Sequence, residues 1–113
     1  MHIDDLETPV SVVDLDRMEA NITRLQAYLD EHKIANRPHI KTHKIPAIAK
    51  MQIDAGAAGI TCQKVSEAEV MADAGFDDIF LPYNILGESK LRRLMALAMR
   101  IKLSVTADSA VTV

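Results

Sequence analysis

A short apolar segment recurs at intervals of about 20 residues along most of this chain, and an amphipathic helical pattern fills each interval. The predicted strands centre near residues 40, 60, 80 and 103. Strands that alternate with helices through short loops are typical of a parallel sheet with crossover connections. No glycine-rich phosphate-binding turn follows any of these strands, which disfavours a dinucleotide-binding Rossmann domain. The pattern therefore predicts an α/β fold of the (β/α)8 TIM-barrel type.

Four strands account for half of such a barrel, which needs about 250 residues. The chain has 113 residues and shows no internal linker or low-complexity segment. We therefore expect residues 1–113 to form the N-terminal portion of a barrel domain in a longer protein, with the later strands absent.

Local signals predict where elements begin and which face they bury. Residues 9–13 contain three valines and are expected to form a first strand, and residues 108–113 are expected to open a further helix. Capping boxes are predicted for Asp16 with Glu19 and for Ser66 with Glu69. Apolar residues at helical spacing are expected to face the core in the first helix (Met18, Ile22, Leu25 and Leu29) and in the last full one (Leu91, Leu94, Met95 and Ala98).

The composition argues against several classes of function. A net charge of −3 and a sequence pI of about 5.7 argue against general nucleic-acid binding. The single cysteine, Cys62, excludes an internal disulfide and fits a reducing compartment. No apolar run reaches membrane-spanning length, and the acidic N-terminus is unlike a signal peptide. We expect a cytoplasmic protein that binds neither nucleic acid nor membrane.

Positive charge is concentrated in one predicted strand, RPHIKTHK, at residues 37–44. Because side chains alternate along a strand, His39, Lys41 and His43 are expected to share one face. The interior of a barrel is packed mainly with branched apolar residues, so three polar side chains on the inward face are unusual. They lie toward the carboxyl end of the strand, where barrel enzymes carry their chemistry. This pattern predicts a functional site.

Three chemistries could use this site. Lys41 could form a Schiff base with an aldehyde, because nearby positive groups such as Arg37 and Lys44 favour its neutral, nucleophilic amine. His39 and His43 could bind a metal ion, although two residues at this spacing on a strand stand too far apart to share one comfortably. The cluster could also bind an anion such as phosphate. The alternative without function is a solvated lysine beside two histidines that serve packing.

Three parts of the sequence together resemble one enzyme family, that of D-threonine aldolase and D-serine dehydratase. They are the opening TPVSVVDLDRMEANI, the basic stretch RPHIKTHK and the segment GAAGITCQKVSEAEVMADAGFDDIFLPYNILG. Members of that family are fold-type III pyridoxal-phosphate enzymes with an alanine-racemase-like barrel. The resemblance runs from about Thr8 to about Gly87 and implies that Lys41 holds the cofactor. Lys44 is the competing lysine, but it directly precedes the next helix and lies off the inward face.

The resemblance implies a lyase that acts on D-β-hydroxy amino acids and converts D-threonine to glycine and acetaldehyde through a Schiff base on Lys41. Once released, Lys41 could transfer a proton, and strand geometry suggests that His39 and His43 orient it or tune its protonation. A D-serine or 3-hydroxyaspartate dehydratase and an amino-acid racemase are alternatives of the same fold. An alternative of a different class is a non-catalytic module that binds pyridoxal phosphate or another phosphorylated ligand.

Other strand ends carry hydrogen-bonding residues that could contact the cofactor or the substrate. Thr61 and Gln63 share a face of the second strand, and Tyr83 and Asn84 close the third. Each of them could equally cap a loop. Cys62 alternates away from its two neighbours and is expected to be a packed small hydrophobe, not a nucleophile.

The family also implies parts that this sequence does not contain. These are the later strands with their phosphate-binding loops and a C-terminal β domain with a divalent metal site for Mn, Mg or Zn. We therefore expect no metal site in residues 1–113, an unpaired first strand, and no activity from these residues alone. The full-length protein is expected to be a homodimer with a D-amino acid as its substrate.

Overall fold

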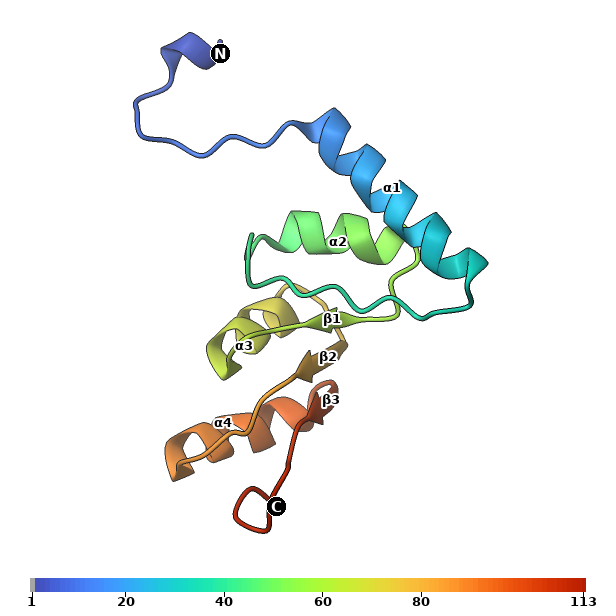
Figure 1. Ribbon diagram of the computed structural model, residues 1–113. Helices are drawn as coiled ribbons and strands as arrows, with labels where there is room; N and C mark the ends of the chain where they lie inside the picture. Colours follow the sequence, from blue (N-terminus) through green and yellow to red (C-terminus); the bar gives the residue numbers. More distant parts are fainter. Residues whose placement is uncertain (1) are drawn as a thin grey trace.

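The computed structural model describes residues 2–113 and shows a small parallel sheet flanked by helices (Figure 1). In chain order the elements are the 3-10 helix η1 (Ile3–Asp5), α1 (Leu15–Glu31), α2 (Pro46–Asp54), β1 (Ile60–Thr61), α3 (Val65–Asp73), β2 (Asp78–Leu81), α4 (Glu88–Ala98) and β3 (Lys102–Val105). The strands pair in parallel in the order β1-β2-β3. His39 forms a parallel bridge with Thr61 and marks a fourth strand position ahead of β1. The predicted α/β class, with parallel strands joined by crossover helices, is confirmed.

The register of the sheet places one row of side chains on a common face. His39 is opposite Thr61. Phe80 of β2 lies between Thr61 of β1 and Ser104 of β3. Residues in register across a parallel sheet point to the same side. His39 therefore shares a face with Thr61, Phe80 and Ser104, and this face extends across all four strand positions.

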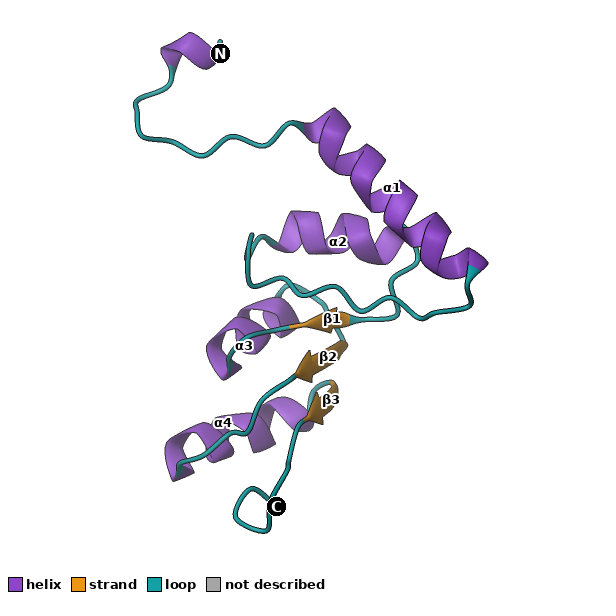
Figure 2. Ribbon diagram, viewed as in Figure 1, coloured by secondary structure: helices purple, strands orange, loops and turns teal. Residues whose placement is uncertain are grey.

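The other face of the sheet is buried under helices. Ile79 and Leu81 flank Phe80 in β2 and are fully buried. α3 packs on β2 and α4 packs on β3, and Figure 2 shows these helices beside the strands. The largest fully buried side chains are Ile40, Ile60, Met71, Ile79, Leu81, Leu97 and Cys62. One apolar core therefore joins the strands to their crossover helices.

α1 begins earlier than predicted and buries a different residue. Asp14 is its N-cap and accepts a hydrogen bond from the backbone N–H of Arg17 at 3.0 Å, so the capping box predicted from Asp16 was wrong. Gln26 is buried, whereas Leu25 is exposed. The other three apolar residues of the predicted face, Met18, Ile22 and Leu29, are half-buried.

The capping box predicted for α3 was also wrong. The N-cap is Lys64, which makes no side-chain cap hydrogen bond, and Ser66 lies within the first turn. Glu69 pairs instead with Arg93 of α4, with its two carboxylate oxygens accepting from the guanidinium at 2.8 Å and 2.5 Å. The carboxylate thus joins two neighbouring helices.

The two predicted elements at the ends of the chain lie outside the sheet. Residues 9–13 form no strand in the structure, and Val10, Val12 and Val13 are exposed. Residues 108–113 form a turn, in which the N–H groups of Thr112 and Val113 both donate to the carbonyl of Ser109, at 3.0 Å and 3.2 Å, and the helix predicted to open there stays a prediction. Among the residues described, no helix is both long enough and apolar enough to cross a membrane.

The buried face of α4 is rotated relative to the prediction. Leu97 is 1% exposed and Leu94 packs against the core, but Met95 is 66% exposed. Leu91 and Ala98 are exposed as well. Only one of the four residues predicted to face inward therefore contacts the core.

We expect Leu97→Ala to lower the free energy of unfolding by about 2–5 kcal/mol, because it opens a cavity in the core. Met95→Ala, on the exposed face of the same helix, is the matched control and should change that free energy by less than about 0.5 kcal/mol. Urea denaturation followed by far-UV circular dichroism measures both. Equal losses in the two variants would contradict the observed orientation of α4.

Candidate active site

The basic stretch leaves the sheet directly after His39. Lys44 N–H donates to the carbonyl of Ile40 at 2.8 Å and closes a turn over the residues between them. The prediction that His39, Lys41 and His43 share one strand face was therefore wrong, because alternation holds only where the backbone is extended. The turn nevertheless lies at the carboxyl end of the strand position that His39 marks.

Lys41 lies in this turn with an exposed side chain. Its backbone N–H donates to Nδ1 of His39 at 3.2 Å. Burial, and then the positive charge of Lys41, lower the pKa of His39 below 6.5, although the Gln63 side chain acts in the opposite sense. No hydrogen bond or ion pair within residues 2–113 involves the Lys41 ammonium group. Lys41 thus presents an unpaired ammonium group beside the imidazole of His39.

Lys44 has a different environment from Lys41. Its ammonium group forms an ion pair with Oε1 of Glu67, a buried residue in the first turn of α3. Oε2 of Glu67 accepts the backbone N–H of Gln63 at 2.8 Å. Burial by itself raises the pKa of Glu67, but the hydrogen bonds from Lys44 and Gln63 outweigh burial and hold that pKa below its usual value. Of the two lysines, Lys44 is engaged and Lys41 is free.

His43 contacts α2. It lines a groove with Met18 of α1 and Gln52 of α2, and its Nδ1 accepts the backbone N–H of Ile45 at 3.0 Å. Nε2 of His43 and Oε1 of Gln52 are both buried without a partner among the residues described. Burial lowers the pKa of His43 below 6.5, and Gln52 acts in the opposite sense. The role of His43 in orienting or tuning Lys41 stays a prediction.

Thr61 and Gln63 lie at the carboxyl end of β1. The hydroxyl of buried Thr61 donates to the carbonyl of Arg37 at 3.3 Å, so it already has a structural partner. Gln63 is exposed, and its side chain approaches the imidazole of His39. Of Thr61 and Gln63, it is therefore Gln63 whose side chain lies toward His39, which contacts Lys41.

Tyr83 and Asn84 follow β2 at the same edge of the sheet. Tyr83 is half-buried and packs against the core. Oδ1 of Asn84 is buried and has no partner among the residues described. A buried oxygen without a hydrogen bond costs free energy, so a polar group bound at this edge would satisfy Asn84. The cofactor-binding roles of Thr61, Gln63, Tyr83 and Asn84 stay predictions.

Cys62 directly follows β1, belongs to the apolar core and is fully buried. Burial, and then the negative charge of Glu67, raise the pKa of the Cys62 thiol to about 12. A thiol with such a pKa carries almost no thiolate at neutral pH. Cys62 is therefore a packing residue, as predicted.

Arg37 lies at the opposite edge of the sheet from Lys41. Its guanidinium pairs with Asp78, the first residue of β2, at 2.6 Å, and Lys102 pairs with the same carboxylate at 2.8 Å. The hydrogen bond from Arg37 is the main cause that holds the pKa of Asp78 below its usual value. The expectation that Arg37 acts on Lys41 was wrong, because Asp78 holds its charge at the amino end of the strands.

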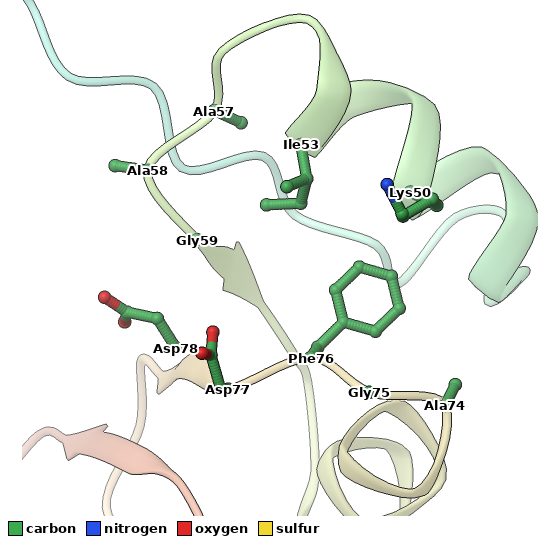
Figure 3. Close-up of a pocket in the computed structure, with 10 residues that line it drawn as sticks. All are labelled: Lys50, Ile53, Ala57, Ala58, Gly59, Ala74, Gly75, Phe76, Asp77 and Asp78. Atoms are coloured by element: carbon green, nitrogen blue, oxygen red, sulfur yellow. The ribbon is translucent and has the colours of Figure 1, made fainter.

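A small pocket of about 210 Å³ also lies at the amino edge, as Figure 3 shows. Its walls come from Ile53, Gly59, Phe76 and Asp78, among others. A side-chain carbon at Gly59 would lie 2.3 Å from the Arg37 guanidinium, so glycine is needed here to admit the ion pair. The amino edge of a parallel barrel serves stability and not chemistry, and Asp78 at this pocket is paired with Arg37 and Lys102.

The comparisons with known proteins agree with this arrangement. The sequence profile described as "Alanine racemase, N-terminal domain" matches residues 13–112. The chain belongs to the alanine racemase N-terminal domain family. The expected family relationship is thereby confirmed.

Individual relatives are enzymes with related names. A D-threonine aldolase of Arthrobacter sp is 47% identical over 105 residues, which are 93% of this chain and 28% of the relative. A D-threo-3-hydroxyaspartate dehydratase of Delftia sp. (strain HT23) is 42% identical over 93 residues, which are 78% of this chain and 24% of the relative. The crystal structure of D-threonine aldolase from Filomicrobium marinum matches with a TM-score of 0.93 at 41% identity and covers 95% of this chain and 29% of that one.

The chain thus spans less than a third of the length of these relatives. One solved structure of a D-threo-3-hydroxyaspartate dehydratase, 39% identical to this chain, is of a mutant in its metal-free form. Within residues 2–113 of the present chain, no group of three or more His, Cys, Asp or Glu side chains is arranged to hold a metal ion.

The two histidines predict how stability depends on pH. Because the pKa values of His39 and His43 are lowered on folding, the unfolded chain binds more protons below its histidine pKa of about 6.5. Their contribution is complete above that value and is lost as the pH falls toward the folded-state pKa values. We expect the free energy of unfolding to fall from about pH 7 to about pH 5, above the range in which carboxylates titrate.

Urea titrations at a series of pH values measure this slope. A variant with His39→Asn and His43→Asn should show a flatter slope over the same range. A wild-type stability that rises on acidification would contradict the burial of the two rings.

Proposed function

We propose that this chain carries the cofactor lysine of a pyridoxal-phosphate-dependent lyase that acts on D-β-hydroxy amino acids, of the D-threonine aldolase type. The observation that carries the proposal is the free amine of Lys41 at the carboxyl edge of the sheet, three residues from a lysine that is paired. The relatives support the substrate class, because each of their names denotes a D-amino acid with a hydroxyl group on its β-carbon.

The residues at this edge fit pyridoxal phosphate. An aldehyde reacts with a primary amine whose protonated form is not held by a carboxylate, and Lys41 meets this need. The unpartnered oxygen of Asn84 and the exposed amide of Gln63 offer hydrogen bonds to a polar ring or to a substrate. When bound, pyridoxal phosphate supplies a ring that withdraws electrons and weakens a bond at the α-carbon of the substrate.

Two residues have defined parts in this proposal. Lys41 holds the cofactor and, once its amine is free again, accepts or returns a proton at Nζ. His39 fixes the backbone of Lys41 through Nδ1, so the neutral ring carries its proton on Nε2 and can donate it there. The part of His39 is to orient the lysine and to present a hydrogen-bond donor beside it.

The proposal covers residues 1–113 as the N-terminal portion of a barrel domain in a cytoplasmic homodimer. A divalent metal that activates the substrate hydroxyl belongs to the rest of that protein. A dehydratase acting on D-3-hydroxyaspartate is the second candidate, supported by the 42% identity to the Delftia enzyme. The aldolase is preferred because the identity to the Arthrobacter enzyme is higher, at 47%, over a larger share of the chain. Product analysis with D-threonine separates glycine and acetaldehyde from a keto acid and ammonia.

We expect pyridoxal phosphate to attach to Lys41 in preference to the other lysines, because Lys41 lies at the carboxyl edge beside His39 and its ammonium group has no ion-pair partner within residues 2–113. The protein is incubated with the cofactor, reduced with borohydride, digested, and mapped by mass spectrometry. The label should persist on Lys41 in Lys44→Ala, and Lys41→Ala should lose most of the labelling.

Lys50→Ala serves as the matched control, since Lys50 forms an exposed ion pair with Asp54 on α2. Its labelling pattern should equal that of the wild type. A label that spreads evenly over the surface lysines would refute the assignment of Lys41.

A further inference from the structure

Glu67 is a buried carboxylate that contacts two segments near Lys41. One is Lys44, at the end of the turn that carries Lys41, and the other is the backbone of Gln63, after β1. The side chain of Glu67 is 7% exposed, whereas that of its partner Lys44 is 54% exposed. One carboxylate oxygen pairs with Lys44 and the other accepts the backbone N–H of Gln63 at 2.8 Å. The carboxylate therefore links α3 to the loop that ends β1 and to the turn that carries Lys41.

The position of Glu67 favours its charged form. It lies in the first turn of α3, where the helix dipole stabilises negative charge. Both of its oxygens have hydrogen-bond donors, so the carboxylate is satisfied although it is buried. Removal of one donor would leave a buried charge unpaired, which makes the ion pair to Lys44 hard to break.

The backbone of Lys44 is held in a costly conformation. Its φ is 55°, in the left-handed region that residues with a side chain rarely adopt. Such a conformation persists where the surroundings fix it. Here the N–H bond to Ile40 closes the turn, and the ion pair to Glu67 anchors the end of the side chain.

The two lysines are three residues apart and both lie at the carboxyl edge of the sheet. An ammonium group held by a carboxylate is stabilised in its protonated form, whereas an unpaired ammonium group loses its proton more readily and then offers its lone pair to an aldehyde. We propose that Glu67 is a positioning residue that fixes the turn carrying Lys41 and keeps the Lys44 amine from competing with it for the aldehyde. This inference rests on the proposed function only for the identity of the aldehyde.

Glu67→Gln tests the inference, because the amide oxygen can still accept from Gln63 N–H while the charge that holds Lys44 is lost. Trace labelling with acetic anhydride, followed by mass spectrometry, reports the reactivity of each lysine without any cofactor. We expect acetylation of Lys44 to rise by at least about threefold relative to Lys41 and Lys90. An unchanged ratio overturns the inference.

Glu69→Gln is the matched control on the same helix. It removes a carboxylate that pairs with Arg93 and touches no lysine, so the acetylation of Lys44 should stay at the wild-type level. A rise of Lys44 labelling in this variant as large as that in Glu67→Gln would overturn the specific role of Glu67.

A measurement on the wild type covers the case in which Glu67→Gln does not fold. Salt at 1 M reduces the Debye length to about 3 Å and weakens the Lys44 pair. Acetylation of Lys44, but not that of Lys41, should therefore increase with salt, and equal responses of the two lysines would contradict the inference.

Borohydride trapping with pyridoxal phosphate separates failure of this inference from failure of the proposed function. In Glu67→Gln the cofactor label should appear on Lys44 as well as on Lys41. A wild type that labels neither lysine refutes the proposed function, while the acetylation ratio still decides the role of Glu67. A wild type labelled on Lys41 and a Glu67→Gln variant with the same pattern refute the competition between the lysines.

Discussion

Parallel pairing brings the carboxyl ends of all strands to one edge of the sheet, and the chemistry of this chain depends on that constraint. The bridge between His39 and Thr61 sets the register of the first strand position. It places the turn with Lys41 next to the loop that follows β1. The polar residues after β2 lie at the same edge, whereas Arg37 and Asp78 meet at the opposite one. The polarity of the sheet thus separates a stabilising ion pair from the free lysine.

Long-period features of the fold could be predicted from the sequence. The alternation of apolar strands and amphipathic helices correctly placed β1, β2 and β3. A buried strand needs a run of apolar residues, and such a run is visible in the order of the residues. The buried state of Cys62 followed from the same period. The position of Lys41 at the carboxyl end of its strand followed from the order of the elements.

Local rules failed where a side chain had a tertiary partner. Glu69 has the spacing of a capping box, but the guanidinium of Arg93 provides a stronger, bidentate partner across the helix pair. Gln26 displaces Leu25 from the buried face of α1 because its amide donates to Asp30 at 2.8 Å and accepts from Asn36 at 3.0 Å. The alternation of the basic stretch failed for a backbone reason, since the turn begins directly after His39. The partners Arg93 and Asn36 lie outside the helices that carry Glu69 and Gln26, so spacing within one element could not reveal them.

The pairing of Lys44 with Glu67 explains how two lysines in one short motif can have different chemistry. Sequence reasoning separated them by strand face, and the turn removes that argument. The structure separates them by charge, because a carboxylate 23 positions along the chain holds one amine and leaves the other. Glu67 could have been found from the sequence only as an acidic residue in the first turn of the next helix, a common position for a solvated carboxylate. Its burial at the carboxyl edge and its ion pair with Lys44 distinguish Glu67 from such a solvated carboxylate. An aldolase and a dehydratase both match this chain at over 40% identity, so one lysine edge is compatible with either cleavage.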